Sequence, residues 1–351
     1  MPFVAEWGWH IKNPQLSNLL MEVNFFLSRW RMPLLFFISG VGTTFVLSRM
    51  SAGNYTIQRL KRLLVPLVFG IFIIVPPQVY MERIFSGEQF KNLIEFYPSI
   101  FTTGPYPEGN FSWHHLWFIA YLLIYSLVAL PVLLWFRSES GQAVIHKTAQ
   151  FSQKTGLYWL VIPTFLASLL WFWYPEETHA IIDDLATLVR YFVYFIAGCF
   201  IGTNTLFWKQ IEDKRREYLK VAFFSTLAFN YLRWNDIEPD FAVTLPNLLC
   251  MVLWAIQSWA CLLALFGYAK KYCNSDSRFL TYANEGIYPF YILHQTVIVI
   301  IAFYVVQTEE TIISKYIFLT AVSFTITVAL YEFLIRPYNP IRFLFGMKDK
   351  A

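Results

Sequence analysis

An ionisable side chain lies deep inside a long apolar run of the sequence, in the segment Tyr-Pro-Phe-Tyr-Ile-Leu-His at 288–294. If this run belongs to a helix whose inner end lies near Tyr282, His294 lies about 18 Å along it, near the middle of a bilayer. An ionisable group at that depth is costly and is a functional candidate by default, and a neutral histidine hydrogen-bonded between helices is the structural alternative. Tyr291 shares a helix face with His294, and Glu285 shares one with Tyr288 one or two turns earlier. Glu285 lies nearer the inner surface, and a solvated carboxylate is the alternative there. We therefore select Glu285, Tyr291 and His294 as candidates for acid–base chemistry.

Two adjacent histidines, His114 and His115, stand at the start of another apolar run. Adjacent residues of a helix point about 100° apart, so at most one of the two faces a given site. No third ligand lies at a useful spacing, and we therefore predict no metal site here. His115 is the candidate base or orienting group, and anchoring at the membrane interface is the alternative.

A pair of arginines, Arg59 and Arg62, directly precedes the apolar run that begins at Leu63. Residues three apart on a helix share a face. A guanidinium group offers two donors in a fixed geometry to phosphate oxygens, so the pair could clamp a phosphate or pyrophosphate at a membrane surface. Ordinary anchoring by basic residues on the cytoplasmic side is the alternative.

The elements that must position these residues are membrane helices. The 351 residues are 57% hydrophobic and only 14% charged, with a net charge of +4, whereas a soluble domain carries about 25% charged residues. This composition excludes soluble, disordered and nucleic-acid-binding proteins. We predict an all-α, polytopic transmembrane helix bundle. Nine runs have the length and composition of spans: 32–48, 63–81, 116–136, 155–175, 185–208, 218–234, 241–269, 286–308 and 316–335.

The charges of the connecting segments predict the orientation. If the segments alternate between the two sides, one side holds 19 of the 27 Lys and Arg residues and the other holds 7, with Arg190 inside a run. Cytoplasmic segments carry the excess of basic residues. We therefore expect Ala351 in the cytoplasm and Met1 on the opposite side, an arrangement that a further helix before Met1 would make easier to insert.

Four segments carry a resemblance that covers essentially the whole chain. They are Phe36-Phe37-Ile38-Ser39-Gly40, the pair Arg59 and Arg62, His114-His115-Leu116-Trp117-Phe118, and Tyr288-Pro289-x-Tyr291-x-x-His294. In this order and placement they resemble the membrane acyltransferase-3 family, in particular its branch of periplasmic-glucan succinyl-transfer proteins. The chain is accordingly expected to form one integral-membrane acyltransferase-like domain over residues 1–351.

The resemblance implies ten helices in a bacterial-type inner membrane and no tightly bound cofactor. It implies an acyl-CoA donor bound from the cytoplasm and an acceptor outside, such as a glycan hydroxyl. Arg59 and Arg62 would then contact the CoA phosphates. The family's first helix carries a basic residue followed ten residues later by a catalytic histidine, a spacing that is absent near Met1. We expect the chain as given to lack that helix, which leaves His294 and His115 as the bases.

Two other classes of function compete with acyl transfer. A secondary transporter also has proline-broken helices and an ionisable residue at mid-membrane, but no pair of related halves is visible and the two arginines would have no special role. An inactive membrane scaffold is the third hypothesis, and the absent helix favours it.

Overall fold

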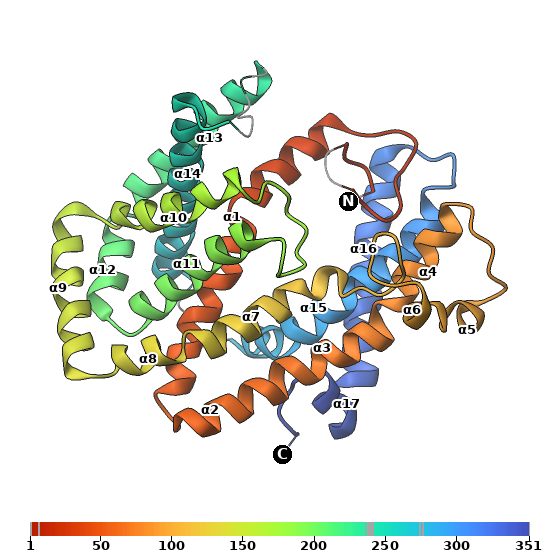
Figure 1. Cartoon of the computed structure of the whole chain (residues 1–351), viewed down its shortest axis with the longest axis horizontal. Coiled ribbons are helices and arrows are strands. Elements are labelled where there is room, and N and C mark those ends of the chain that lie inside the picture. Colours follow the sequence, from red (N-terminus) through yellow and green to blue (C-terminus); the bar gives the residue numbers. More distant parts are fainter. Residues whose placement is uncertain are drawn as a thin grey trace. The chain divides into compact units, whose positions relative to one another are not determined.

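The chain is almost entirely helical. The computed structural model describes residues 2–5, 8–235, 237, 242–273, 275 and 277–350 (Figure 1). These residues contain no β-strand, only an isolated bridge between Pro105 and Phe111. The prediction of an all-helical protein is confirmed. In chain order the elements are α1 (Asn18–Leu47), α2 (Ala52–Arg59), η1 (Leu60–Leu64), α3 (Val65–Phe69), η2 (Gly70–Ile74), α4 (Pro76–Phe85), α5 (Leu93–Phe96), α6 (Ser99–Thr102), η3 (His114–Leu116), α7 (Trp117–Val128), α8 (Leu130–Phe136), α9 (Glu139–Thr155), η4 (Tyr158–Leu160), α10 (Val161–Ser168), η5 (Leu169–Phe172), α11 (Leu185–Gly202), α12 (Thr205–Asp213), α13 (Arg215–Trp234), α14 (Leu245–Tyr272), α15 (Arg278–Val305), α16 (Ile312–Leu330), η6 (Tyr331–Ile335) and α17 (Asn339–Leu344).

Several helices are long and apolar enough to cross a membrane. In the described part of the chain there are six of them, or up to eight if each of two bent pairs is one span. The six are Asn18–Leu47, Ala52–Phe85, Leu185–Gly202, Leu245–Tyr272, Arg278–Val305 and Ile312–Ile335. The two pairs, bent by 54° and 112°, are His114–Val128 with Leu130–Phe136, and Glu139–Thr155 with Tyr158–Phe172.

The nine spans that the sequence predicts are therefore not confirmed. The predicted span 218–234 does form a helix, α13, but this helix is not among those apolar enough to cross. Arg215 and Lys220 near its beginning and Arg233 at its end explain the difference, because they leave only a short uncharged stretch between them. Met1 and Ala351, whose sides the loop charges predict, lie outside the described residues.

The two bends have local causes. Pro131 lies in the first turn of α8, where its missing N–H and fixed φ are tolerated, so the helix restarts there at a new angle. The sharper bend follows Gly156, which caps α9 with φ +80°, a backbone conformation that glycine adopts without a Cβ clash. Both changes of direction follow from residue types at the break.

The chain divides into two compact units. The first consists of Met1–Asn24, Ile57–Leu123 and Asp276–Ala351. Within it α15 packs against α16 and α4, and the non-helical N-terminal segment lies on α15 and α16 through Phe3, which clusters with Ala302 and Leu319. This unit holds every candidate site residue.

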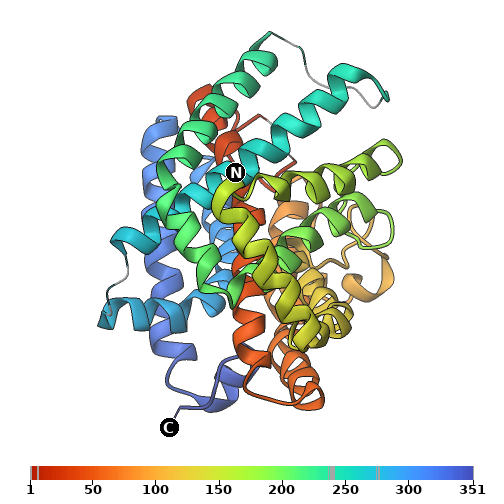
Figure 2. The same cartoon turned by 90° about the vertical axis from the view of Figure 1, so that its left-hand side faces the viewer.

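The second unit consists of Phe25–Thr56 and Ile124–Ser275. In it α13 packs along α14, and α10 packs on α11, as both views show (Figures 1 and 2). Helix α1 approaches α11 closely at Gly40, where an added Cβ would lie 2.1 Å from the carbonyl oxygen of Phe195. The absence of a side chain at Gly40 thus permits close packing of these two helices. The hydroxyl of Ser39 donates to the carbonyl of Leu35, one turn earlier, at 2.8 Å.

The segment between α4 and η3 is held in place from α4. The Arg83 guanidinium donates to the side-chain oxygen of Asn110 at 2.8 Å and to the carbonyls of Pro107 and Gly109 at 2.7 and 2.8 Å. These three bonds fix the course of the chain just before it enters η3. They therefore also fix the position of His114.

Candidate functional site

Three of the predicted candidates meet in the first unit. His115, in η3, lies with its ring centroid 5.4 Å from that of His294 on α15, and the two rings are perpendicular. The ring of Tyr291, one turn before His294, lies 5.5 Å from that of His115. The Tyr291 hydroxyl also donates a hydrogen bond to the backbone carbonyl of His115. The fold thus joins residues that are far apart in the sequence into one cluster.

The hydrogen bonds of the two histidines indicate which ring nitrogens carry protons. His115 Nε2 lies 3.0 Å from the carbonyl of Ile292, and His294 Nδ1 lies 2.6 Å from the carbonyl of Tyr291. A carbonyl can only accept, so each of these nitrogens is the donor and the other nitrogen of each neutral ring has the lone pair. For His115 this is Nδ1, which is buried and makes no hydrogen bond within the described structure. This arrangement suits a proton acceptor.

The arginine pair is connected to the same helix. The hydroxyl of Tyr288, one turn before Tyr291, donates to the backbone carbonyl of Arg62 at 3.1 Å. Tyr288 contacts Arg62 and Tyr291 contacts His115. The two tyrosines are only about 4.5 Å apart along the axis of α15. Helix α15 therefore connects the arginine motif and the histidine motif within a single turn.

The shared α-helical face expected for Arg59 and Arg62 is not formed in regular geometry. Arg59 is the last residue of α2, and Arg62 lies in η1, a five-residue π-helix that follows directly. A π-turn winds more widely than an α-turn, so the two side chains are not set at the α-helical spacing, and such turns are frequent at functional sites.

Glu285 does not join the histidines. Its carboxylate pairs with Arg342 at 2.9 Å and with Arg336 at 3.8 Å, near the beginning of α15. Nine residues of helix separate it from His294, about 13 Å along the axis. Arg336 also pairs with Glu332 at 2.7 Å, four residues before it. The candidate role of Glu285 in acid–base chemistry with His294 is thus not supported by its position, because arginines occupy its carboxylate.

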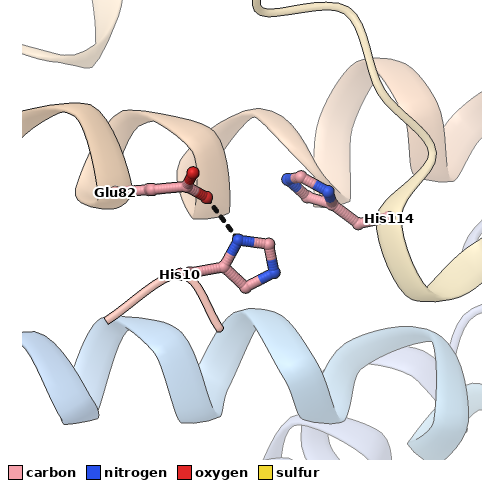
Figure 3. Close-up of side chains that lie close together, drawn as sticks. All are labelled: His10, Glu82 and His114. Carbon is pink, nitrogen blue, oxygen red and sulfur yellow. Dashed lines mark hydrogen bonds and ion pairs between the residues drawn. The ribbon is translucent and has the colours of Figure 1, made fainter. Parts of the chain in front are cut away.

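Sequence reasoning overlooked a second polar cluster beside the first. His10 Nδ1 bonds to the Glu82 carboxylate, and the His10 and His114 ring centroids are 4.3 Å apart (Figure 3). The other oxygen of Glu82 accepts from the Tyr106 hydroxyl at 2.9 Å. Burial and the neighbouring Glu82 carboxylate raise the pKa of Tyr106, so this hydroxyl keeps its proton and remains a donor. His10 also lies 3.1 Å from the Gln295 amide of α15.

His10 gave no sequence signal because it belongs to a non-helical segment with no periodicity. The Glu82 carboxylate stands at the end of an apolar run, where an exposed interfacial acid is the ordinary expectation. Only the packing of the N-terminal segment against α15 and α16 brings His10 to α4 and η3.

The chain is similar to known proteins over nearly its whole length. The family model Acyl_transf_3, an acyltransferase domain, matches residues 4–332. Glucans biosynthesis protein C of Salmonella typhi and that of Salmonella typhimurium are each 22% identical to it, over 97% of this chain and 88% of theirs. The protein of the same name from Salmonella paratyphi B is 24% identical over 38% of this chain and 33% of its own. No solved structure matches.

The match with the family model spans most of the chain, and the described helices include several that can cross a bilayer. The resemblance inferred from the four sequence segments is thereby confirmed. The chain is an integral membrane protein and belongs to the acyltransferase-3 family of acyltransferases.

Proposed function

We propose that this protein transfers an acyl group from acyl-CoA, bound on the cytoplasmic side, to a hydroxyl group of a glycan on the other side of the inner membrane. Membership of the acyltransferase family supports the reaction class. The name of the relatives, Glucans biosynthesis protein C, supports a glycan as the acceptor. The distribution of basic residues among the connecting segments supports a cytoplasmic C-terminus.

The observation that carries the proposal is the double contact of α15 with the two motifs. Tyr288 holds the backbone of Arg62, and Tyr291 holds the backbone of His115, one turn away. A donor whose phosphates bind at Arg59 and Arg62 would thus lie next to the element that carries the histidines. Proximity of this kind converts a reaction between two molecules into one within a complex.

The chemistry requires one proton acceptor. His294 takes the proton of the acceptor hydroxyl as its oxygen attacks the thioester carbonyl. The carbon–sulfur bond then breaks, and the protonated His294 gives that proton to the leaving thiolate, which departs as CoA thiol. The Tyr291 carbonyl, which accepts from His294 Nδ1, keeps the lone pair of the neutral ring on Nε2. His115 Nδ1, buried in the same cluster, is the second position that can accept a proton.

A direct test uses the purified full chain in detergent with radiolabelled succinyl-CoA or acetyl-CoA and a linear glucan. The proposal predicts release of free CoA thiol that depends on the glucan, together with label on the glucan. A transporter would instead move labelled substrate into proteoliposomes with no release of CoA, and a scaffold would do neither. Either of these results would overturn the proposed function.

A further inference from the structure

The cluster of His10, Glu82 and His114 has the composition of a metal site. Each residue offers one ligand atom, and these atoms lie within 4.8 Å of one another (Figure 3). We propose that His10, Glu82 and His114 bind a divalent transition metal ion of the zinc type. Two imidazoles and one carboxylate are a known donor set for zinc sites that keep a fourth position for water. The site is distinct from the arginines and from the His115–His294 pair of the proposed acyl transfer.

The hydrogen bonds of His114 orient its imidazole ring in a way that suits a metal ligand. Its backbone N–H donates to Ser112 Oγ at 3.0 Å, and its Nδ1 lies 3.0 Å from the same oxygen. A hydroxyl oxygen has two lone pairs and can accept both bonds, and in that tautomer the lone pair of neutral His114 is on Nε2. Nε2 is buried and makes no hydrogen bond within the described structure. The backbone of His114 is held at φ +39°, an uncommon conformation for a residue other than glycine.

The neighbours supply the outer contacts that metal ligands usually have. Tyr106 donates to the Glu82 oxygen that does not face His10. The Gln295 amide nitrogen, which donates to Gln78 Oε1 at 3.2 Å, lies 3.1 Å from His10 Nε2 and helps to orient the His10 ring. Bonds of this type orient ligating histidines and carboxylates and raise their affinity for the metal. The nearby guanidinium group of Arg83 donates its hydrogen bonds to the loop carbonyls and to Asn110.

The cluster is not fully enclosed. The side chains of His10 and Glu82 are 10% and 13% exposed, so the cluster is accessible at its edge. Ligand atoms at zinc-like bond lengths lie roughly 3.4 Å apart in a tetrahedral site, so the widest pair must close by at most about 1.4 Å. Rotation of the His10 and Glu82 side chains, which lie on a non-helical segment and near a helix end, can provide that movement.

The test measures metal binding directly. The full chain is purified without a histidine tag, loaded with Co²⁺ or Zn²⁺, desalted and assayed for metal content. The proposal predicts one ion per chain, a visible absorption spectrum of four- or five-coordinate Co²⁺, and loss of that spectrum on adding Zn²⁺. It also predicts that Zn²⁺ raises the melting temperature, because a ligand that binds the folded state stabilises it.

Three substitutions remove a ligand: His10→Ala, Glu82→Gln and His114→Ala. Each should abolish the stoichiometric ion and the rise in melting temperature, whereas His146→Ala, at an exposed histidine of α9, should retain both. Tyr106→Phe removes only an outer contact and should weaken Co²⁺ binding roughly tenfold to a hundredfold.

A parent chain that retains no stoichiometric metal overturns the proposal, whether or not the variants fold. Ligand variants that bind as much metal as the parent overturn it as well. Because these readouts are independent of acyl transfer, the metal site and the proposed function can fail separately.

Discussion

The hydroxyl of Tyr291 donates a hydrogen bond to the backbone carbonyl of His115 and so ties the middle of α15 to the start of α7 through η3. One turn earlier, Tyr288 makes the equivalent bond to the carbonyl of Arg62. Two tyrosines of one motif thus hold the backbones of two other motifs. Since both bonds use the phenol hydroxyl, replacement by phenylalanine removes the bond and little else.

The paired tyrosine variants test this arrangement. Tyr291→Phe and Tyr288→Phe should each lower the free energy of unfolding by about 1 kcal/mol, the typical net value of one hydrogen bond. Tyr288→Phe should mainly weaken acyl-CoA binding, because it releases the segment of Arg62, and Tyr291→Phe should mainly lower turnover, because it releases His115. The measurements are thermal unfolding, donor affinity and turnover. Equal effects of both variants on donor affinity would contradict the division of roles.

His294→Gln should leave expression and the melting temperature unchanged and lower turnover by about 10²–10⁴-fold, the usual contribution of a general base. Glutamine keeps similar size and hydrogen-bonding capacity but does not titrate. Turnover is followed by release of CoA thiol, with His146→Gln at an exposed histidine as the control. Full activity of the variant would show that His294 is structural and would leave His115 as the base.

Arg62→Lys should weaken acyl-CoA binding even though it retains the positive charge. Lysine lacks the planar pair of donors that fits phosphate oxygens. Loss of one charge-assisted contact costs about 1.5–3 kcal/mol, or roughly ten- to a hundredfold in affinity. Lys61→Ala, between the two arginines, is the matched control. If Arg59→Ala and Arg62→Ala both bind CoA as tightly as the parent, the pair serves only as a membrane anchor.

Gly40→Ala should destabilise the second unit, because its new Cβ would lie 2.1 Å from the carbonyl oxygen of Phe195. Overpacking of this kind typically costs about 1–3 kcal/mol. Gly42→Ala, on the same helix, meets nothing within 4 Å and should be neutral or slightly stabilising, since alanine is the better helix former. The comparison requires only the melting temperatures of the two variants in detergent, and similar values would refute the close approach of α1 and α11.

The ion pair of Glu177 with Arg190 should make stability depend on pH in the acid range. Burial alone would raise the pKa of Glu177, but the charge of Arg190 outweighs it and holds this pKa below its usual range. A carboxylate with a lowered folded-state pKa contributes stability above its unfolded pKa of about 4.3, and that stability is lost as the pH falls through the folded value.

The check is the melting temperature as a function of pH for the parent and for Glu177→Gln. The parent should lose stability more steeply than the variant as the pH is lowered below about 4.3, and Glu176→Gln, at the exposed neighbouring position, should behave as the parent does. Identical slopes for the parent and Glu177→Gln would contradict the role of this ion pair.

The sequence by itself determined the helical class, the membrane setting and the motifs of the acyltransferase family. These follow from local properties: apolar runs must form helices in lipid because every backbone polar group needs an internal partner. It also singled out His115, Tyr291 and His294 as candidates, because the type of each residue and its place along an apolar run can be read from the sequence alone. The run 218–234 carries Lys220 and Arg233 near its two ends, and α13, which contains it, is not among the described helices apolar enough to cross.

The tertiary structure alone decided which of these residues meet. Glu285 shares a helix with His294, but the chain after α16 returns to place Arg342 against its carboxylate. His10, in a segment without periodicity, reaches Glu82 and His114 only because that segment packs on α15 and α16. Contacts between residues so distant in the chain depend on how whole helices pack, and no local pattern of residue types records that packing.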